Sequence, residues 1–469
     1  MMETGQEGTI DVSSHALQDA HARTRSTWGR ASLNRKHVVN RRIFMRSNKY
    51  PPAIGPVGCL AVGLLLLAST PLSWAQSGAR APQYVVVKLG SLGGTVSKSN
   101  AVNDRGWVSG WSNLVGDLNH HAVLWINGQL NDLGTLGGPT SEIEFIARNN
   151  FGMFAGGSDT SDIDPYGENF YAMVPSDQFL ESAFQWQKGM MSPLPGLGGN
   201  NSYAANSNRS GHIVGVAETV LDSNCLAPQV FDFHGALWKD GKIQDLPPLS
   251  GDAIAGALGI NDHDVAVGGS GYCGSIGVLG FAMILHAVIW RDGSPTELTS
   301  LGGQFNNSAV DINNRGQVVG LSDVPGDTST HAVLWQNGSI TDLGTLAGDA
   351  SSFAWAISED GKMIFGQSCD ANGNCRGFLW QNGVMTDVNT LIPAHSQLII
   401  IDANDINGAG DITGQAFDPL TGETPAIELI PCAKIDDPEC ESEARGSVRV
   451  ALPQNVRDAL KAKRLRFRK

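Results

Sequence analysis

A tryptophan that ends a strand-like stretch recurs six times in this chain, at intervals of 45 to 61 residues. A dipeptide ending in glycine begins two residues after each copy, as Asn337-Gly338 does after Trp335. Asn-Gly and Asp-Gly favour two-residue hairpin turns, because both central residues need positive φ. Each repeat is therefore expected to contain a β-hairpin. The tryptophans are Trp125, Trp186, Trp238, Trp290, Trp335 and Trp380.

A second hairpin precedes the tryptophan in each repeat. Between residues 308 and 320, SAVDIN and QVVG flank a turn that ends at Gly316. Each unit therefore has four strands, and the 57 glycines of the chain fit the many turns that this requires. Units of this length with four strands are typical of a β-propeller, whereas the repeats of a stacked solenoid are usually shorter. Equivalent turns end at Gly106, Gly152, Gly211, Gly361 and Gly410.

Leu-Gly-Gly elements and their variants connect successive units, and seven unit starts can be counted when Leu391 is included. The last unit lacks an outer strand. The segment Tyr84–Leu92, YVVVKLGSL, matches the outer strand SITDLGTL of another unit. A ring closed in this way leaves no exposed sheet edge. We therefore predict an all-β fold, a seven-bladed β-propeller closed by the N-terminal strand.

The first 75 residues have the features of a signal peptide with an N-terminal extension. Cys59–Ser69 is an apolar run too short to span a bilayer, basic residues precede it, and Ser73 and Ala75 supply the small residues of a cleavage site. Met45 would open a signal peptide of ordinary length and is a candidate true start. We expect a bacterial protein that is secreted or periplasmic, with no membrane span after cleavage.

The rest of the chain divides into the propeller, residues 76–432, and a disulfide-bearing linker with a basic tail, residues 433–469. Residues 76–440 hold 14 basic and 39 acidic side chains, a net charge of −25. Nucleic-acid binding needs cationic surface, so this composition argues against it. A helix is expected after Pro453, in a tail that is solvated; docking on an anionic surface, lipid or the propeller itself, is the alternative.

Six cysteines follow the signal peptide, an even number for a compartment where disulfides persist. Short separations favour the pairs Cys369–Cys375 and Cys432–Cys440. The remaining pair would be Cys225–Cys273, which fall in equivalent loops of successive repeats. Six cysteines allow fifteen pairings, so this choice depends on the repeat model.

The combined motifs LGxLGG, INxxGQVVG, HAxxW and NGxxxDLGTLGG resemble those of the bacterial HAF-repeat proteins, described as extracellular repeat proteins. The motif that names the family is present as His121-Ala122-Val123 and His331-Ala332-Val333, with Val in place of Phe, and two repeats have Ser182 and Arg376 in place of the histidine. The resemblance covers about residues 84 to 430. It implies export and a repeat fold, and it supplies no catalytic residues.

One end of the ring should carry the long loops of repeats 2 to 4. A noncatalytic scaffold that binds protein or glycan through these loops, as a monomer and without a cofactor, is the leading hypothesis. The alternative is a carbohydrate-active hydrolase or lyase with acidic residues near the ring axis. The aromatic residues of the candidate surface are Tyr166, Phe170, Tyr171, Phe179, Phe231, Phe233, Tyr272 and Phe281.

Asp159, Asp162 and Asp164 are weak candidates for a calcium site, since the stretch lacks the twelve-residue calcium-loop pattern. The repeated histidines are expected to form hydrogen bonds within each blade, because equivalent positions on different blades lie too far apart to share one ion. The sequence has no Gly-x-Ser-x-Gly and no HExxH motif, and no catalytic residue is predicted. These histidines are His121, His234, His286 and His331.

Overall fold

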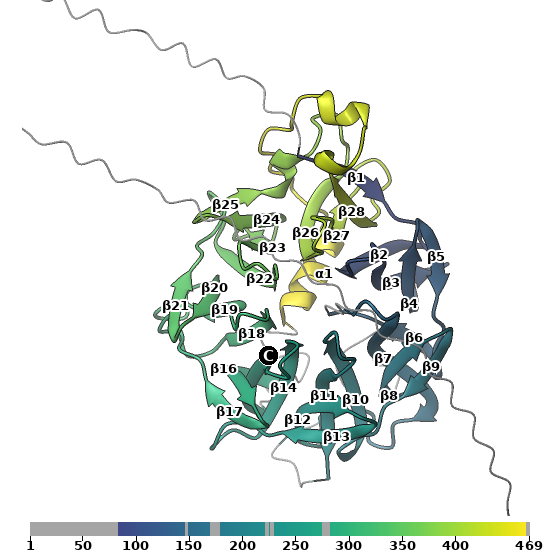
Figure 1. The fold of residues 1–469 in the computed structure, drawn as a ribbon, viewed down its shortest axis with the longest axis vertical. Coiled ribbons are helices and arrows are strands. Elements are labelled where there is room, and N and C mark those ends of the chain that lie inside the picture. The colour runs from purple at the N-terminus through teal and green to yellow at the C-terminus, as the bar shows by residue number, and fades with distance from the viewer. Residues whose placement is uncertain are drawn as a thin grey trace, which may run out of the picture. The chain divides into compact units, whose positions relative to one another are not determined.

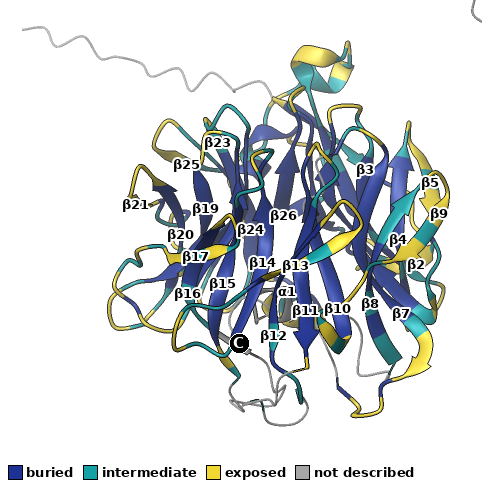
Figure 2. Ribbon diagram, turned by 60° about the horizontal axis from the view of Figure 1, so that its bottom comes forward, coloured by how far each residue is buried: buried dark blue, intermediate teal, exposed yellow. Residues whose placement is uncertain are grey.

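Seven four-stranded antiparallel sheets form a ring in the computed structural model, which confirms the predicted seven-bladed propeller (Figure 1). The structure describes residues 83–145, 149–168, 179–220, 225, 229–273 and 282–465. In six blades the strands follow the chain from the innermost to the outermost. Buried residues fill the strands, and exposed residues gather on the turns and loops at their ends (Figure 2).

The first three blades contain β2 (Gly93–Val102), β3 (Val108–Leu114), β4 (His120–Ile126) and β5 (Gln129–Asp132); β6 (Gly137–Glu142), β7 (Met153–Ile163), β8 (Phe179–Gln187) and β9 (Met190–Pro193); and β10 (Gly198–Ser207), β11 (Ile213–Thr219), β12 (Phe233–Lys239) and β13 (Lys242–Leu246). Blades 4 and 5 contain β14 (Ile254–Ile260), β15 (Ala266–Cys273), β16 (Ala282–Arg291) and β17 (Ser294–Glu297); and β18 (Asn307–Ile312), β19 (Val318–Asp323), β20 (Thr330–Gln336) and β21 (Ser339–Asp342).

Blade 6 contains β22 (Ser351–Ile357), β23 (Met363–Cys369), β24 (Cys375–Gln381) and β25 (Val384–Asp387), and blade 7 contains β26 (Ile399–Ile406), β27 (Ile412–Phe417), β28 (Ala426–Pro431) and β1 (Tyr84–Lys88). The described residues also form three short 3-10 helices, η2 (Val388–Leu391), η3 (Cys432–Lys434) and η4 (Pro438–Glu441), and one α-helix, α1 (Gln454–Leu465).

The ring closes because β1 is the outer strand of the last blade. It pairs antiparallel with β28, from Tyr84 opposite Pro431 to Lys88 opposite Ile427. Lys88 also forms a 2.7 Å ion pair with Glu423 in the loop before β28. The predicted closure by the N-terminal strand is therefore present.

The two ends of the ring carry different connections. We call the end with the strand 2 to 3 loops and the Leu-Gly-Gly connections the loop face, and the end with the tight glycine turns the turn face. On the turn face, Asn337 and Asn382 have φ values of 52° and 53° and are followed by glycines, also at positive φ. This is the geometry that the Asn-Gly dipeptides predict.

Each of four tryptophans ties its blade to the one before. The indole N–H donates to a backbone carbonyl in the connection that leaves the preceding blade. The repeated tryptophan is therefore a link between blades as well as a core residue. The bonds are Trp125 to Gly90 (2.9 Å), Trp238 to Pro195 (2.7 Å), Trp290 to Pro247 (2.8 Å) and Trp335 to Thr299 (2.7 Å).

Asparagines link neighbouring blades on the turn face. Each uses its side-chain amide to donate to a backbone carbonyl of the next blade in the ring, which explains why the INN and IND motifs recur in the inner-strand turns. The donors and acceptors are Asn103 to Asn149, Asn208 to Asn261, Asn261 to Asn313, Asn313 to Ser358, and Asn407 to Asn103.

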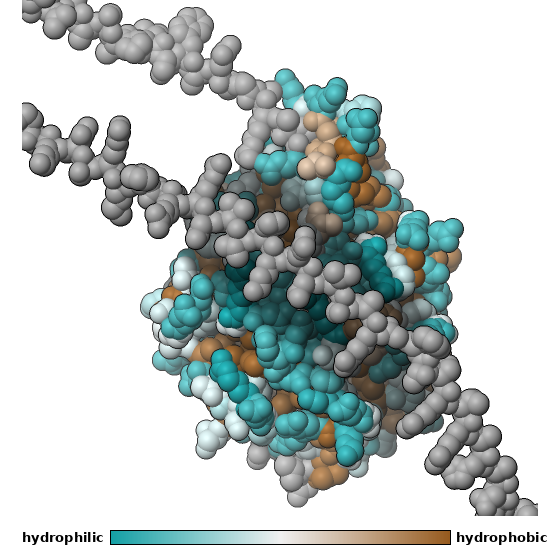
Figure 3. Space-filling view, viewed as in Figure 1, coloured by the Kyte–Doolittle hydropathy of each residue, from teal (hydrophilic) through white to brown (hydrophobic). Residues whose placement is uncertain are grey.

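Polar residues surround the hollow middle of the ring in the view of Figure 3.

The C-terminal segment packs into the ring, so the expectation of a solvated tail is wrong for its described part. Leu452, Val456 and Leu460 are each less than 5% exposed and belong to one apolar cluster with the inner strands. The Leu452 N–H donates to Asn374 Oδ1 (2.9 Å) in a loop-face loop of blade 6. Helix α1 thus lies within the ring in Figure 1, as the alternative of docking on the propeller predicted.

Replacing Trp290 by Phe tests the link between blades. The change removes the N–H that donates to the Pro247 carbonyl while keeping an aromatic ring, so we expect the free energy of unfolding to fall by about 1 to 3 kcal/mol. Urea denaturation measures it. Trp186→Phe is the control for loss of the indole without loss of a link, since no described residue accepts from its N–H, although Trp186 is half-buried and Trp290 is 1% exposed. Equal losses in the two variants would contradict a role for the hydrogen bond.

Candidate functional site

Exposed apolar side chains gather on the loop face. Of the eleven large hydrophobic residues that are exposed in the described part of the chain, eight lie on its loops and three on the turn face. The eight come from six of the seven blades and form an apolar rim. The rim residues are Val115, Leu118, Ile163, Tyr166, Val220, Tyr272, Phe305 and Leu420; Phe151, Met190 and Val384 lie on the turn face.

The structure places the predicted aromatic residues only partly on this rim. Tyr166 and Tyr272 are 55% and 41% exposed. Phe231 is half-buried and makes an edge contact with Tyr166, with ring centroids 5.1 Å apart, which joins the loops of blades 2 and 3. Phe179 and Phe233 are half-buried. Phe233 packs against the apolar cluster of inner-strand residues that also holds Leu452, Val456 and Leu460, here called the axial core. Phe170, Tyr171 and Phe281 lie outside the described residues.

A pair of buried carboxylates also joins the loops of blades 2 and 3. Glu168 accepts from the backbone N–H groups of Val230 and Phe231. Glu218 accepts from Asn201 N (2.8 Å). Burial, followed by the charge of Glu168, raises the pKa of Glu218 to about 7. Burial also raises the pKa of Glu168.

Of the metal candidates, Asp159 and Asp164 are buried and Asp162 is exposed. Asp164 Oδ2 accepts from Asn201 Nδ2 (2.8 Å), and its other oxygen accepts from Tyr166 N (2.7 Å). In the described part of the chain the three aspartates do not form a group close enough to share an ion. The one such group has Asp232 with two cysteines that are already joined as a disulfide.

The repeated histidines pair with aspartates of their own blades, which confirms their structural role. Three bind the aspartate of the outer strand, and His286 binds Asp252 before its own inner strand. In blade 6, Arg376 replaces the histidine and forms ion pairs with Asp387 (2.9 Å) and Asp349 (2.8 Å). The histidine pairs are His121 with Asp132, His234 with Asp245, His331 with Asp342, and His286 with Asp252, each at 2.9 Å.

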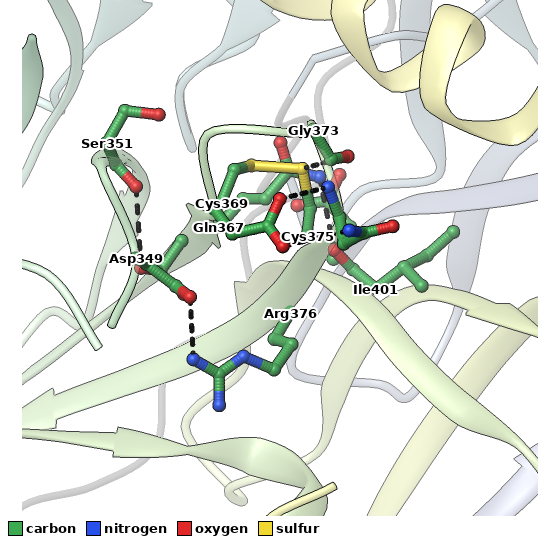
Figure 4. Close-up of a disulfide and its surroundings, with 12 residues drawn as sticks. Asp349, Ser351, Gln367, Cys369, Gly373, Cys375, Arg376 and Ile401 are labelled. Atoms are coloured by element: carbon green, nitrogen blue, oxygen red, sulfur yellow. Dashed lines mark hydrogen bonds and ion pairs between the residues drawn. A yellow bond between two sulfur atoms is a disulfide. The ribbon is translucent and has the colours of Figure 1, made fainter. Parts of the chain in front are cut away.

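The structure contains the three predicted disulfides, Cys225–Cys273, Cys369–Cys375 and Cys432–Cys440. The first connects the loop-face loops of blades 3 and 4. The second is buried beside Gln367 and the Asp349–Arg376 ion pair (Figure 4) and belongs to the apolar cluster that receives α1. Two of the three therefore fix the loop face.

Near the axis, a pocket of about 320 Å³ opens between blades 1, 2 and 7 and helix α1. Its polar lining is held by buried pairs. Lys98 of β2 forms an ion pair with Glu144, which also accepts from Trp111 Nε1 (2.7 Å). His120 Nε2 lies 3.1 Å from Glu142 Oε2. Sequence analysis did not identify this pocket.

No family model and no curated protein matches the sequence. Among solved structures, the β-propeller domain of the Trilobed protease from Pyrococcus furiosus is 9% identical, with a TM-score of 0.42, and the match covers 75% of this chain and 94% of that one. TolB from Acinetobacter baumannii is 13% identical, with a TM-score of 0.33, covering 77% and 82% of the two chains. Dipeptidyl peptidase 4 from Porphyromonas gingivalis is 9% identical, with a TM-score of 0.33, covering 74% and 60%.

The carboxylate pair predicts how stability depends on pH. The folded-state pKa of Glu218 lies above its unfolded value, so the protonated form favours the fold, and this stabilisation is lost as the pH rises through about 7. Glu218→Gln removes the ionisation. We expect the variant to exceed the wild type in free energy of unfolding by about 1 to 3 kcal/mol at pH 8, and to match it near pH 4.5. Urea denaturation at both pH values checks this. A difference that does not vary with pH would contradict it.

Proposed function

We propose that this chain is an exported, noncatalytic propeller that binds a protein partner through its loop face. The observation that carries the proposal is the apolar rim. Single exposed hydrophobic residues are normal on protein surfaces, but eight of the eleven in the described part of the chain lie on the loop face, and we take this uneven distribution as the mark of an interaction site. The rim lies at one end of a ring whose blades are joined by hydrogen bonds. Such a rigid framework suits a protein that presents binding loops.

The chemistry of the rim favours a protein over a glycan as its partner. Five of its eight residues are aliphatic, namely Val115, Leu118, Ile163, Val220 and Leu420. Aliphatic side chains bury against other apolar side chains and offer no hydrogen bonds to the hydroxyl groups of a sugar. The body of the chain is strongly acidic, so the partner should present an apolar centre with basic residues around it.

Export is supported by three features. The apolar run and cleavage site of residues 1–75 have the form of a signal peptide, and lie outside the described residues. Three disulfides fit an extracellular or periplasmic protein. The resemblance to HAF-repeat proteins points the same way. In the part of the chain that the structure describes, no helix is long and apolar enough to cross a membrane.

A photo-crosslinking amino acid at position 118 tests the proposal, with position 384 on the turn face as the control. We expect a specific protein adduct at position 118 in cells that express the chain, and none at position 384. The purified adduct partner is then titrated against the wild type and variants. Leu118→Asp combined with Leu420→Asp should weaken its binding at least tenfold, because charges replace buried apolar contacts. Val384→Asp should not change it.

Two results would overturn the proposal. The first is an adduct partner whose affinity is unaffected by the two rim substitutions. The second is binding of the wild type, and not of the double variant, to vesicles of phosphatidylethanolamine and phosphatidylglycerol in a flotation assay, because the rim would then contact lipid and not protein.

A further inference from the structure

The axial pocket is a built polar site that shares one residue, Leu118, with the rim. Three of its charged side chains are at least nine-tenths buried: Lys98 is 3% exposed, Glu142 1% and Glu144 8%. They come from two different blades, yet each is held by a hydrogen bond or ion pair with a described residue. Burying charges is costly unless they are paired, and three charged groups around one cavity make it unlike an ordinary packing gap.

We propose that this pocket binds a small neutral or amino saccharide. Its volume of about 320 Å³ lies at the lower end of the range for small-molecule sites. It offers both kinds of hydrogen-bonding group that a polyol needs. The carboxylate oxygens of Glu142 and Glu144 already accept from protein groups, and a carboxylate oxygen has a second lone pair that can take a further bond. Lys98 has three N–H groups, and one of them donates to Glu144.

An apolar ring in the wall completes the chemistry of a saccharide site. The half-buried indole of Trp111 lines the pocket, and its N–H is held by Glu144 at 2.7 Å. The imidazole of His120 lies against the same indole, with ring centroids 4.9 Å apart. These contacts fix the plane of the tryptophan. A fixed aromatic face beside hydrogen-bonding groups suits the apolar face and the hydroxyl edge of a sugar ring.

The balance of charge selects the class of saccharide. Among the described lining residues, Asp117, Glu142 and Glu144 are acidic and Lys98 is the one lysine or arginine. A phosphorylated, sulfated or uronic sugar would bring further negative charge into this site and would be repelled. A neutral sugar escapes this repulsion, and an amino sugar gains an attraction.

Helix α1 supplies the fourth wall. Asn455, Val456, Ala459 and Leu460 line the pocket, while Val456 and Leu460 also anchor the helix in the axial core. The pocket therefore exists in this form because the C-terminal segment is docked. A bound saccharide would contact the helix as well as blades 1 and 2.

Isothermal titration of the exported chain with three disaccharides tests the assignment: cellobiose, the glucosamine disaccharide and digalacturonate. We expect one-to-one binding of at least one of the first two, and no measurable binding of digalacturonate. Lys98→Met and Trp111→Ala should each weaken that binding at least tenfold, through loss of the ammonium donor and of the aromatic face. Lys242→Met, at an exposed position on β13, is the matched control and should bind like the wild type.

Thermal unfolding of each variant shows whether it is folded, and His120→Asn provides a second pocket variant if Lys98→Met is not. The proposal is overturned if neither cellobiose nor the glucosamine disaccharide binds, if digalacturonate binds more tightly than both, or if the folded pocket variants bind like the wild type. Leu118 belongs to both the rim and the pocket lining, so the pocket variants separate the two proposals. Lys98 and Trp111 are not rim residues, and Lys98→Met and Trp111→Ala should therefore leave the affinity for the protein partner unchanged.

Discussion

The hydrogen bonds between β1 and β28 are the interaction on which the rest of the structure depends. Without them the last blade has three strands and an open edge, and the ring is a curved row of sheets with two ends. With them, every blade has a neighbour on both sides. The inner strands of the first and last blades then pack side by side, so the ring has a fixed circumference. This fixes the shape of the pocket and of the apolar surface that α1 packs against.

Two kinds of hydrogen bond join neighbouring blades, and they lie at different places in the ring. Tryptophan indoles donate near the outer connections, and asparagine amides donate at the inner turns on the turn face. Both kinds of donor bind backbone carbonyls, so these hydrogen bonds do not depend on which side chains the neighbouring blade carries. This leaves the loop-face side chains free to differ from blade to blade. The apolar rim and the acidic pocket both lie at that end of the ring.

The sequence predicts the features that repeat and misses those that do not. The hairpin turns and two of the disulfides follow from local spacing, as Asn337 shows within a single repeat. The blade number, the closing strand and the Cys225–Cys273 disulfide follow from comparing one repeat with another. The pocket follows from neither, since Lys98 and Glu144 meet only because blades 1 and 2 are neighbours in a closed ring. The helix-like spacing of Val456 and Leu460 is visible in the sequence. Its partner surface is assembled from inner strands of many blades, and no stretch of sequence displays it.

The closure also has a consequence for the order of events in biosynthesis. Strand β1 is among the first propeller segments to be made, and β28 leaves the ribosome more than 330 residues later. Until then β1 has no partner, and the axial surface that receives α1 is incomplete. A chain threaded across a membrane from its N-terminus can therefore finish this ring only after nearly all of it has crossed. With the export proposed above, the propeller would complete its folding on the far side of that membrane.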